Sequence, residues 1–139
     1  MLKVIIAGSR NFNDYDFLED KCIEVLKPYI DKWYLSGYLS EDRDNLEIVS
    51  GAARGADILG EKFARKRGLK IKRFPAQWGK YKKSAGFIRN REMAKYASSN
   101  NDHGVLIAFW DGESRGTNHM IETAKRYGLE VFVIHVEKQ

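Results

Sequence analysis

The chain contains little cysteine and proline and lacks any long apolar run. One of its 139 residues is cysteine and two are proline. The single thiol, Cys22, can form neither an internal disulfide nor a metal cluster, as is typical of proteins from a reducing compartment. No apolar run approaches the roughly 20 residues that a membrane-spanning helix needs, and the start MLKVIIAGSR lacks the layout of a signal peptide. We therefore expect a cytoplasmic protein without a membrane segment.

Several short functional motifs are also missing. The sequence has no G-x-G-x-x-G and no G-x-x-x-x-G-K-[ST], which excludes an ordinary dinucleotide-binding dehydrogenase and a P-loop NTPase. It has no G-x-S-x-G nucleophile elbow either. His103, His119 and His135 lack metal-ligand spacing with one another. We predict no bound metal.

The net charge is moderately positive, at +5, with 24 Lys and Arg against 19 Asp and Glu. This charge suits a polyanionic partner without requiring one. The lysine-rich segment 80–83 makes nucleic-acid binding one alternative, in which affinity falls steeply with salt. The basic residues are spread along predicted helices, however, and the chain lacks the aromatic platform of RNA-binding modules.

Apolar runs alternate with helical patterns along the whole chain. Asp14 is a candidate helix cap, Gly68 and Gly128 are helix ends, and segment 33–45 has no periodicity and reads as an excursion. Alternation of this kind implies parallel strands joined by right-handed crossovers. We predict one domain over residues 1–139, an α/β three-layer sandwich with a mainly parallel, doubly wound five-stranded sheet of order 3-2-1-4-5. The predicted strands are 2–7, 46–50, 69–74, 104–109 and 131–136, and the predicted helices are 14–31, 55–67, 86–98 and 117–127.

Glycine, serine and arginine gather after three of these strands, in AGSRNFND, SGAARGAD and FWDGESRGT. Parallel α/β sheets bind ligands beyond the carboxyl ends of their strands, near the point where strand order reverses. Glycine admits close backbone approach, helix-start amides attract anions, and guanidinium grips phosphate at two points. Taken singly, each loop also fits ordinary turn chemistry; taken together they predict a phosphate site. The predicted residues are Gly8, Ser9, Arg10, Ser50, Gly51, Arg54, Gly55, Asp111, Gly112, Ser114, Gly116 and Thr117.

The segment after the third strand, FPAQWGKYKKSAGFIRNREM, leads into a helix at the same sheet end. Arg89 and Asn90 at the start of that helix are further candidates for ligand binding. Trp78 and Tyr81 either stack on a base or pack the loop onto the domain.

Four stretches, AGSRNFND, VSGAARGADILGEKFARKRGL, FPAQWGKYKKSAGFIRNREMA and AFWDGESRGTNHMIETAKRYGL, resemble the YspA-like family of the SLOG superfamily. The resemblance covers almost the whole chain. It implies a Rossmann-like fold with a pocket for a nucleotide or nucleotide derivative at the glycine-rich loops. The superfamily includes the DNA-processing protein DprA, the LOG phosphoribohydrolases and sensors of NAD-derived or cyclic nucleotide signals.

The chain departs from the LOG enzymes in the segment that carries their catalytic glutamate. Their pattern is P-G-G-x-G-T-x-x-E, whereas this chain reads WDGESRGTNHMIE and lacks the proline and the early glutamate. Glu122 falls two residues too late, which turns its side chain by roughly 200° on a helix. The catalytic residues are therefore unknown, and Asp57, Asp111 and Glu92 are the candidate carboxylates.

These observations predict a module that binds or senses a nucleotide-like phosphate ligand, such as NAD, ADP-ribose or AMP. The first alternative is a hydrolase that cleaves a nucleotide N-glycosidic bond, as the LOG enzymes do. The second is DprA-like nucleic-acid binding. The sequence leaves open both the identity of the ligand and the existence of a homo-oligomer.

Overall fold

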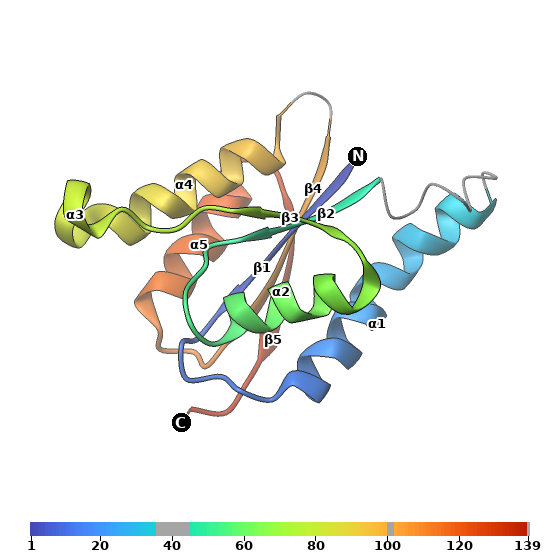
Figure 1. Cartoon of the computed structure of the whole chain (residues 1–139), viewed down its shortest axis with the longest axis horizontal. Coiled ribbons are helices and arrows are strands. Elements are labelled where there is room, and N and C mark those ends of the chain that lie inside the picture. Colours follow the sequence, from blue (N-terminus) through green and yellow to red (C-terminus); the bar gives the residue numbers. More distant parts are fainter. Residues whose placement is uncertain (36–44, 100–101, 139) are drawn as a thin grey trace.

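The computed structural model describes residues 1–35, 45–99 and 102–138. Its centre is a five-stranded sheet in which every neighbouring pair is parallel and the order is β3-β2-β1-β4-β5 (Figure 1). This order confirms the one predicted from the alternating pattern. The strands are β1 (Leu2–Gly8), β2 (Leu46–Ser50), β3 (Lys70–Arg73), β4 (His103–Trp110) and β5 (Glu130–His135).

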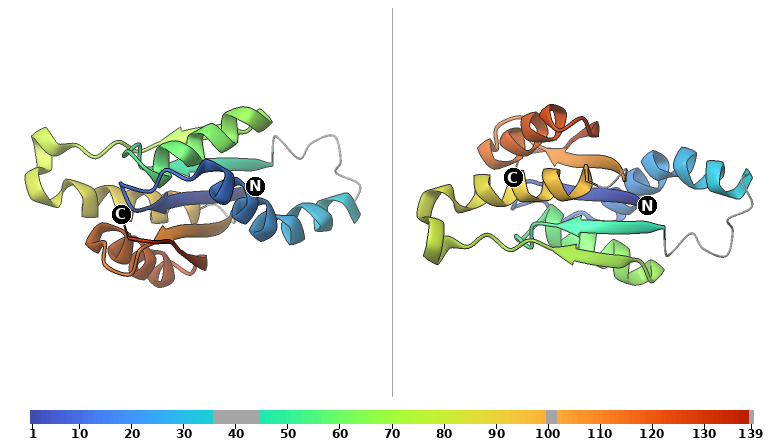
Figure 2. Two further views of the ribbon diagram at one scale, coloured as in Figure 1. Left: turned by 90° about the horizontal axis from the view of Figure 1, so that it is seen from below. Right: turned by 90° about the horizontal axis from the view of Figure 1, so that it is seen from above.

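Helices cover both faces of the sheet, which makes the fold Rossmann-like (Figure 2). Val4 and Ile6 of β1 belong to the apolar layer that α1 and α2 cover, whereas Ile5 and Ala7 belong to the layer that α4 and α5 cover. Successive side chains of a strand point to opposite faces, so a strand buried on both faces is apolar throughout. The helices are α1 (Tyr15–Leu35), α2 (Ala56–Arg67), α4 (Ala85–Ala97) and α5 (Arg115–Arg126), with the short α3 (Trp78–Tyr81) and the 3-10 turn η2 (Lys82–Ser84) between β3 and α4.

Most predicted helix ends lie where their chemistry places them. The carboxylate of Asp14 accepts a hydrogen bond from the Phe17 amide at 3.1 Å and caps α1. Gly68 and Gly128 adopt left-handed conformations at the ends of α2 and α5. Helix α1 runs to Leu35, beyond the predicted end at 31, and α5 begins two residues before the predicted 117. Of the predicted excursion 33–45, residues 36–44 lie outside the described residues.

Helix α2 crosses β1 at very short range because glycines lie at the contact. A Cβ atom on Gly60 would lie 2.8 Å from Cβ of Ile6. A Cβ atom on Gly55, which has a φ of 85°, would lie 2.4 Å from the Ser9 carbonyl oxygen. Glycine is therefore required at both positions, and the start of α2 lies directly against the loop that follows β1.

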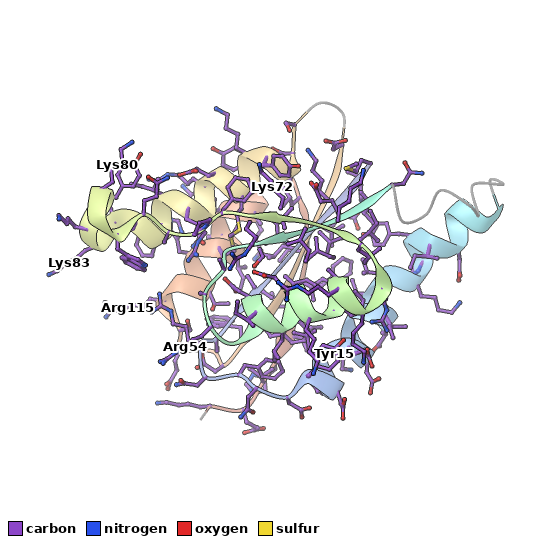
Figure 3. All side chains as sticks on the ribbon, in the orientation of Figure 1. Tyr15, Arg54, Lys72, Lys80, Lys83 and Arg115 are labelled. Carbon is purple, nitrogen blue, oxygen red and sulfur yellow. The ribbon has the colours of Figure 1, made fainter. Side chains whose placement is uncertain are left out.

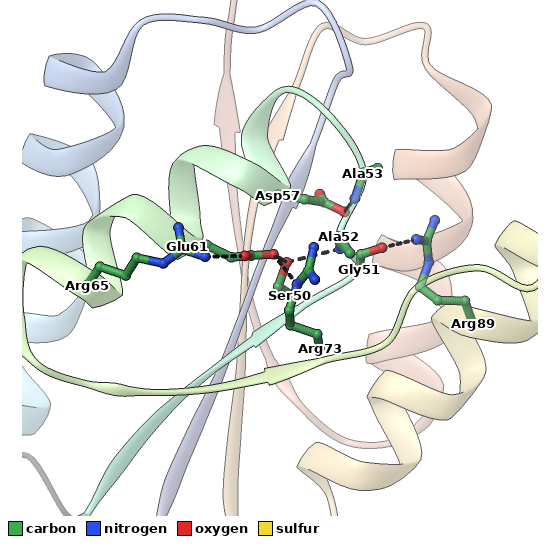
Figure 4. A network of polar contacts seen from close by, with 9 residues as sticks. All are labelled: Ser50, Gly51, Ala52, Ala53, Asp57, Glu61, Arg65, Arg73 and Arg89. Atoms are coloured by element: carbon green, nitrogen blue, oxygen red, sulfur yellow. Dashed lines mark hydrogen bonds and ion pairs between the residues drawn. The ribbon is translucent and has the colours of Figure 1, made fainter.

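The buried carboxylate of Glu61 connects α2 to β2 and β3 (Figure 4). Glu61 is 1% exposed and accepts hydrogen bonds from the Ser50 hydroxyl at 2.7 Å, from Arg73 Nε at 3.1 Å and from Arg65 Nη2 at 2.9 Å. The Ser50 hydroxyl also accepts a bond from the Ala52 amide at 3.0 Å. This network connects β2, α2 and β3 and sets the path of the loop after β2.

We predict that Gly60→Ala destabilises the protein although alanine is the better helix former. The added methyl group would overpack the contact with Ile6, which costs about 1–3 kcal/mol of the free energy of unfolding. Gly86→Ala is the matched control, because its Cβ would meet its nearest neighbours at an ordinary 3.7 Å. That variant should leave stability unchanged or raise it by up to about 1 kcal/mol. Urea denaturation followed by circular dichroism measures both, and equal effects would contradict the tight crossing of α2 over β1.

Candidate ligand-binding site

A cavity of about 350 Å³ lies at the carboxyl ends of the central strands. Its walls come from the loops after β1, β2 and β4, from the first turn of α2, from the middle of α4 and from the first two turns of α5. Several elements that are distant in the sequence therefore meet at one place, as the strand-end rule predicts. The lining residues are Ala7, Gly8, Ser9, Arg10, Asn11, Ala53, Arg54, Asp57, Arg89, Asn90, Met93, Asp111, Ser114, Gly116, Thr117 and Met120.

Most of the residues proposed from the sequence line this cavity, but five do not. Ser50, Gly51 and Gly55 lie behind the lining, Gly112 lies in the open part of its loop, and Glu92 is an exposed residue of α4. Glu122, which the sequence already placed outside the LOG pattern, is exposed and lies 3.9 Å from Lys125. Among the candidate carboxylates, Asp57 and Asp111 line the cavity.

Five lining residues are missing from the sequence-based set, and the first of them, Ala7, directly precedes Gly8 at the end of β1. Asn11 directly follows Arg10, and Ala53 directly precedes Arg54, so both lie on loops that the sequence already singled out. Met93 and Met120 follow Asn90 and Gly116 by three and four positions. Residues at this spacing share a helix face, which is a signal that the sequence contained.

Three arginines bring positive charge to the cavity. Arg10 and Arg54 are exposed, whereas Arg89 is half-buried, and burial lowers its pKa. Figure 3 shows Arg54, on the loop before α2, on the same side of the molecule as Arg115 at the start of α5. Exposed guanidinium groups remain available for a ligand, and guanidinium suits the two-point recognition of phosphate.

Arg89 is held in place by the loop after β2 (Figure 4). Its Nη1 donates to the Gly51 carbonyl at 2.6 Å, and its Nε donates to Oδ1 of Asn90 at 3.0 Å. A Cβ atom on Gly51 would lie 2.7 Å from Arg89 Nη1 and 2.7 Å from an Asp57 carboxylate oxygen. Gly51 thus lets the loop after β2 approach both Arg89 and Asp57, because a side chain at this position would push the loop away from these two charged groups.

The start of α5 presents backbone amides that the protein leaves without side-chain caps. Ser114 is the N-cap residue, but its hydroxyl pairs with the Thr117 hydroxyl at 3.1 Å and makes no cap hydrogen bond. The first amides of a helix have no partner within the helix, and they carry the positive end of its dipole. Gly116 and Thr117 line the cavity, so this helix start is arranged as anion sites commonly are.

Asp111 is committed to the turn before α5. Its Oδ1 accepts hydrogen bonds from the Ser114 amide at 2.8 Å and from the Glu113 amide at 2.9 Å. These two bonds lower the pKa of Asp111, and the nearby Ser9 hydroxyl adds a smaller contribution. Asp111 is therefore a charged turn residue, which makes it a poor proton carrier near neutral pH.

Ser9 has a buried hydroxyl that no described group binds. The residue is 7% exposed and lines the cavity; its Oγ lies close enough to Asp111 to contribute to the lowered pKa of that carboxyl, but it makes no hydrogen bond of standard geometry with any described residue. Its backbone is fixed, since its amide donates to the Phe109 carbonyl at 3.0 Å. A buried polar group without a partner is costly. Ser9 therefore offers an unused hydrogen bond to whatever occupies the cavity.

Asp57 is a carboxyl group with a perturbed proton affinity. It is 5% exposed, and one oxygen accepts a hydrogen bond from the Ala53 amide at 3.2 Å. Burial raises the pKa of Asp57 from 3.8 to about 6, against the opposing effect of the Arg89 charge. Perturbed titratable groups in a cavity are frequent at functional sites, and this one changes charge close to neutral pH.

Asn90, in the middle of α4, connects this helix to the start of α5. Its Nδ2 donates to the Gly116 carbonyl at 3.2 Å and lies 3.1 Å from Nδ1 of His119. Burial lowers the pKa of His119, which favours the neutral ring that accepts this bond. The amide of Asn90 is thus used to hold α4 against α5, so its role in the site is positioning.

Within residues 1–35, 45–99 and 102–138, no three His, Cys, Asp or Glu side chains are grouped to hold a metal ion. No helix in this part of the chain is both long and apolar enough to cross a membrane.

The model of one protein family matches residues 2–81, more than half of the chain. That family is described as YspA, cpYpsA-related SLOG family. The chain belongs to this SLOG family. Neither the comparison with curated proteins nor the comparison with solved structures found a match. In this SLOG protein the matched range runs from β1 to α3 and contains Ser9, Arg10, Arg54 and Asp57, whereas the start of α5 lies outside it.

We predict that Asp57→Asn stabilises the protein at high pH and not at low pH. Because the pKa is raised in the folded state, the native carboxyl binds its proton more tightly than the unfolded one. The contribution of Asp57 to stability therefore falls as pH rises from about 4 to about 6. At pH 8 the variant should unfold with a free energy about 2–3 kcal/mol higher than the wild type, and near pH 4 the two should converge.

Asp111→Asn provides a control of opposite sign, since the lowered pKa of Asp111 makes its charge favourable at pH 8. Urea denaturation at both pH values measures the differences. A pH-independent difference between wild type and Asp57→Asn would contradict the assignment.

Proposed function

We propose that this SLOG protein binds a small nucleotide or nucleotide-derived phosphate ligand, of the NAD, ADP-ribose or AMP type, as a binding or sensing module. The observation that carries the proposal is the unpartnered, buried hydroxyl of Ser9 in a cavity that arginines line. SLOG domains are thought to bind nucleotide-derived ligands, and this cavity has the groups that such a ligand needs.

The phosphate is best accommodated between the start of α5 and the loop after β1. The amides of Gly116 and Thr117 approach from the α5 side, and Ser9 and Arg10 approach from the β1 side. Arg54 comes from the loop before α2. This arrangement supplies amide, hydroxyl and guanidinium donors to one anion, and it lies between β1 and β4, where the strand order reverses.

Isothermal titration calorimetry with NAD, ADP-ribose, AMP and cyclic AMP tests the proposal directly. Binding of at least one of these at micromolar affinity would support it. Absence of heat with the entire panel, and with inorganic phosphate, would overturn it.

Ser9→Ala should weaken ligand binding while leaving the fold at least as stable. The substitution removes a buried hydroxyl that has no partner in the free protein, so the free energy of unfolding should rise by about 1 kcal/mol. A phosphate that accepts a bond from this hydroxyl should bind about 1.5–3 kcal/mol more weakly. Arg10→Ala and Arg54→Ala should weaken binding by similar amounts with little change in stability, because both side chains are exposed.

Thr123→Val is the matched control for Ser9. The Thr123 hydroxyl is equally buried and has no partner among the described residues, but it does not line the cavity. Thr123→Val should raise the free energy of unfolding, as Ser9→Ala does, but it should leave the affinity for the ligand unchanged. Arg126→Ala, at the opposite end of α5, is the control for the arginines. If all the variants and their controls bind with equal affinity, the donors identified here do not contact the ligand.

A second candidate function is hydrolysis of a nucleotide N-glycosidic bond, which Asp57 favours. Its carboxyl group lines the cavity and has a pKa of about 6. A base with a pKa near the working pH is well suited to activate water. In this reaction water adds its hydroxyl to the anomeric carbon of ribose, the bond to the base breaks, and the base leaves with a proton.

If the protein is such a hydrolase, chromatography should detect free base released from AMP or NAD. The rate should rise with pH through about 6, as Asp57 becomes ionised. Asp57→Asn should abolish release while binding persists, whereas Glu92→Gln, on the exposed side of α4, should retain the wild-type rate. Binding without release of base by the wild type would leave the binding module as the function.

A further inference from the structure

Trp78 is a large aromatic side chain that the fold leaves 49% exposed. It begins α3, which contains no buried residue, and the following turn η2 contains none either. Figures 1 and 2 show that α3 projects beyond the carboxyl end of β3, and Figure 3 places Lys80 and Lys83 on this projection. Both alternatives that the sequence left open for Trp78 are therefore compatible with its burial: about half of its surface packs against the domain, and about half is free to stack on a ligand.

The indole of Trp78 lies beside the arginines of the cavity. The guanidinium carbon of Arg10 is 5.7 Å from the centroid of the Trp78 ring. A Cβ atom placed on Gly86 would lie 3.7 Å from Cη2 of Trp78 and 3.7 Å from Nη2 of Arg89. Arg10 and Arg89 both line the cavity, so the ring stands at its rim.

The described lining of the cavity includes no aromatic side chain on which a base could stack. It consists of aliphatic, polar and charged residues and methionines. Two other described aromatic residues are strongly exposed, Phe87 and Tyr127. Phe87 already stacks on His119, with centroids 4.0 Å apart, and Tyr127 lies at the far end of α5. Trp78 is therefore the exposed ring beside the proposed phosphate site.

We infer that Trp78 is the stacking surface for the base of the ligand, so that the ligand is a nucleotide whose phosphate enters the cavity and whose base lies at the rim. This inference rests on the proposed function, and it adds which part of the ligand is recognised outside the cavity. Stacking on an indole tolerates any base, because every base has a π-face. Trp78 thus makes the protein bind nucleotides more tightly than sugar phosphates, with little preference among the bases.

The test compares AMP with ribose 5-phosphate, which carries the same sugar and phosphate without a base. The wild type should bind AMP more tightly, by roughly 5- to 150-fold, as expected for one stacked base. Trp78→Leu should remove this preference and leave the affinity for ribose 5-phosphate unchanged, because α3 contributes no buried side chain. Trp78→Phe should retain much of the preference. Tyr127→Leu, which removes an aromatic residue of similar exposure, should keep the wild-type ratio.

Tryptophan fluorescence gives a readout that does not depend on the Leu variant being folded. AMP should quench a component of the wild-type emission that is missing from Trp78→Phe, and ribose 5-phosphate should not. Equal affinity of the wild type for the two probes would overturn the inference while the proposed function stands. An equal loss of both affinities in folded Trp78→Leu would also overturn it, because it would show that Trp78 only holds Arg10. Binding of neither probe by the wild type would overturn the inference as well, whereas the proposed function falls only if the whole panel and inorganic phosphate also fail to bind.

Discussion

The close crossing of α2 over β1 is the constraint on which the rest of the site depends. A Cβ atom on Gly60 would collide with Ile6, and one on Gly55 would collide with the Ser9 carbonyl. Only with these two glycines does the loop before α2 reach the loop after β1. That contact brings Arg54 and Asp57 to the cavity beside Ser9 and Arg10, so the packing of one helix on one strand assembles much of the polar wall.

The protein keeps charge inside the cavity at a cost in stability. Burial raises the pKa of Asp57 and lowers that of Arg89, so for each group the folded state disfavours the charged form. The Ser9 hydroxyl adds a third unfavourable group, since it is buried without a described partner. Groups of this kind are unfavourable for folding alone and are expected where a ligand will complete their interactions. The stability cost of these three residues and their position at the cavity therefore both support the proposal that the cavity binds a ligand.

The sequence predicts the features that depend on residues close together in the chain. It misses those that depend on contacts between residues further apart in the chain. The strand order, the cap at Asp14 and the ends at Gly68 and Gly128 follow from local patterns, and the structure has them. The placement of Ser9 and Arg10 at the cavity follows from the strand-end rule. The sequence also predicts Ser50 as a ligand-binding residue, because it lies on the same kind of loop, but in the structure its hydroxyl donates a hydrogen bond to Glu61. Nothing in the local sequence shows that Glu61, eleven residues later, is buried behind that loop.

The proposed site is divided between the two halves of the chain, and in the proposals above this division separates the groups that would hold a ligand from those that would select it. The family model covers β1 to α3 and thus Ser9, Arg10 and Trp78, whereas the α5 amides come from beyond residue 81. An anion at the α5 start is attracted by backbone groups that any sequence supplies. In the proposed site, selection would then come from side chains, and Ser9, Arg10 and Trp78 all lie within the range that the family model matches. Since Arg10 lines the cavity and also lies beside the Trp78 ring, it is the residue that would couple the proposed phosphate binding to the proposed base recognition.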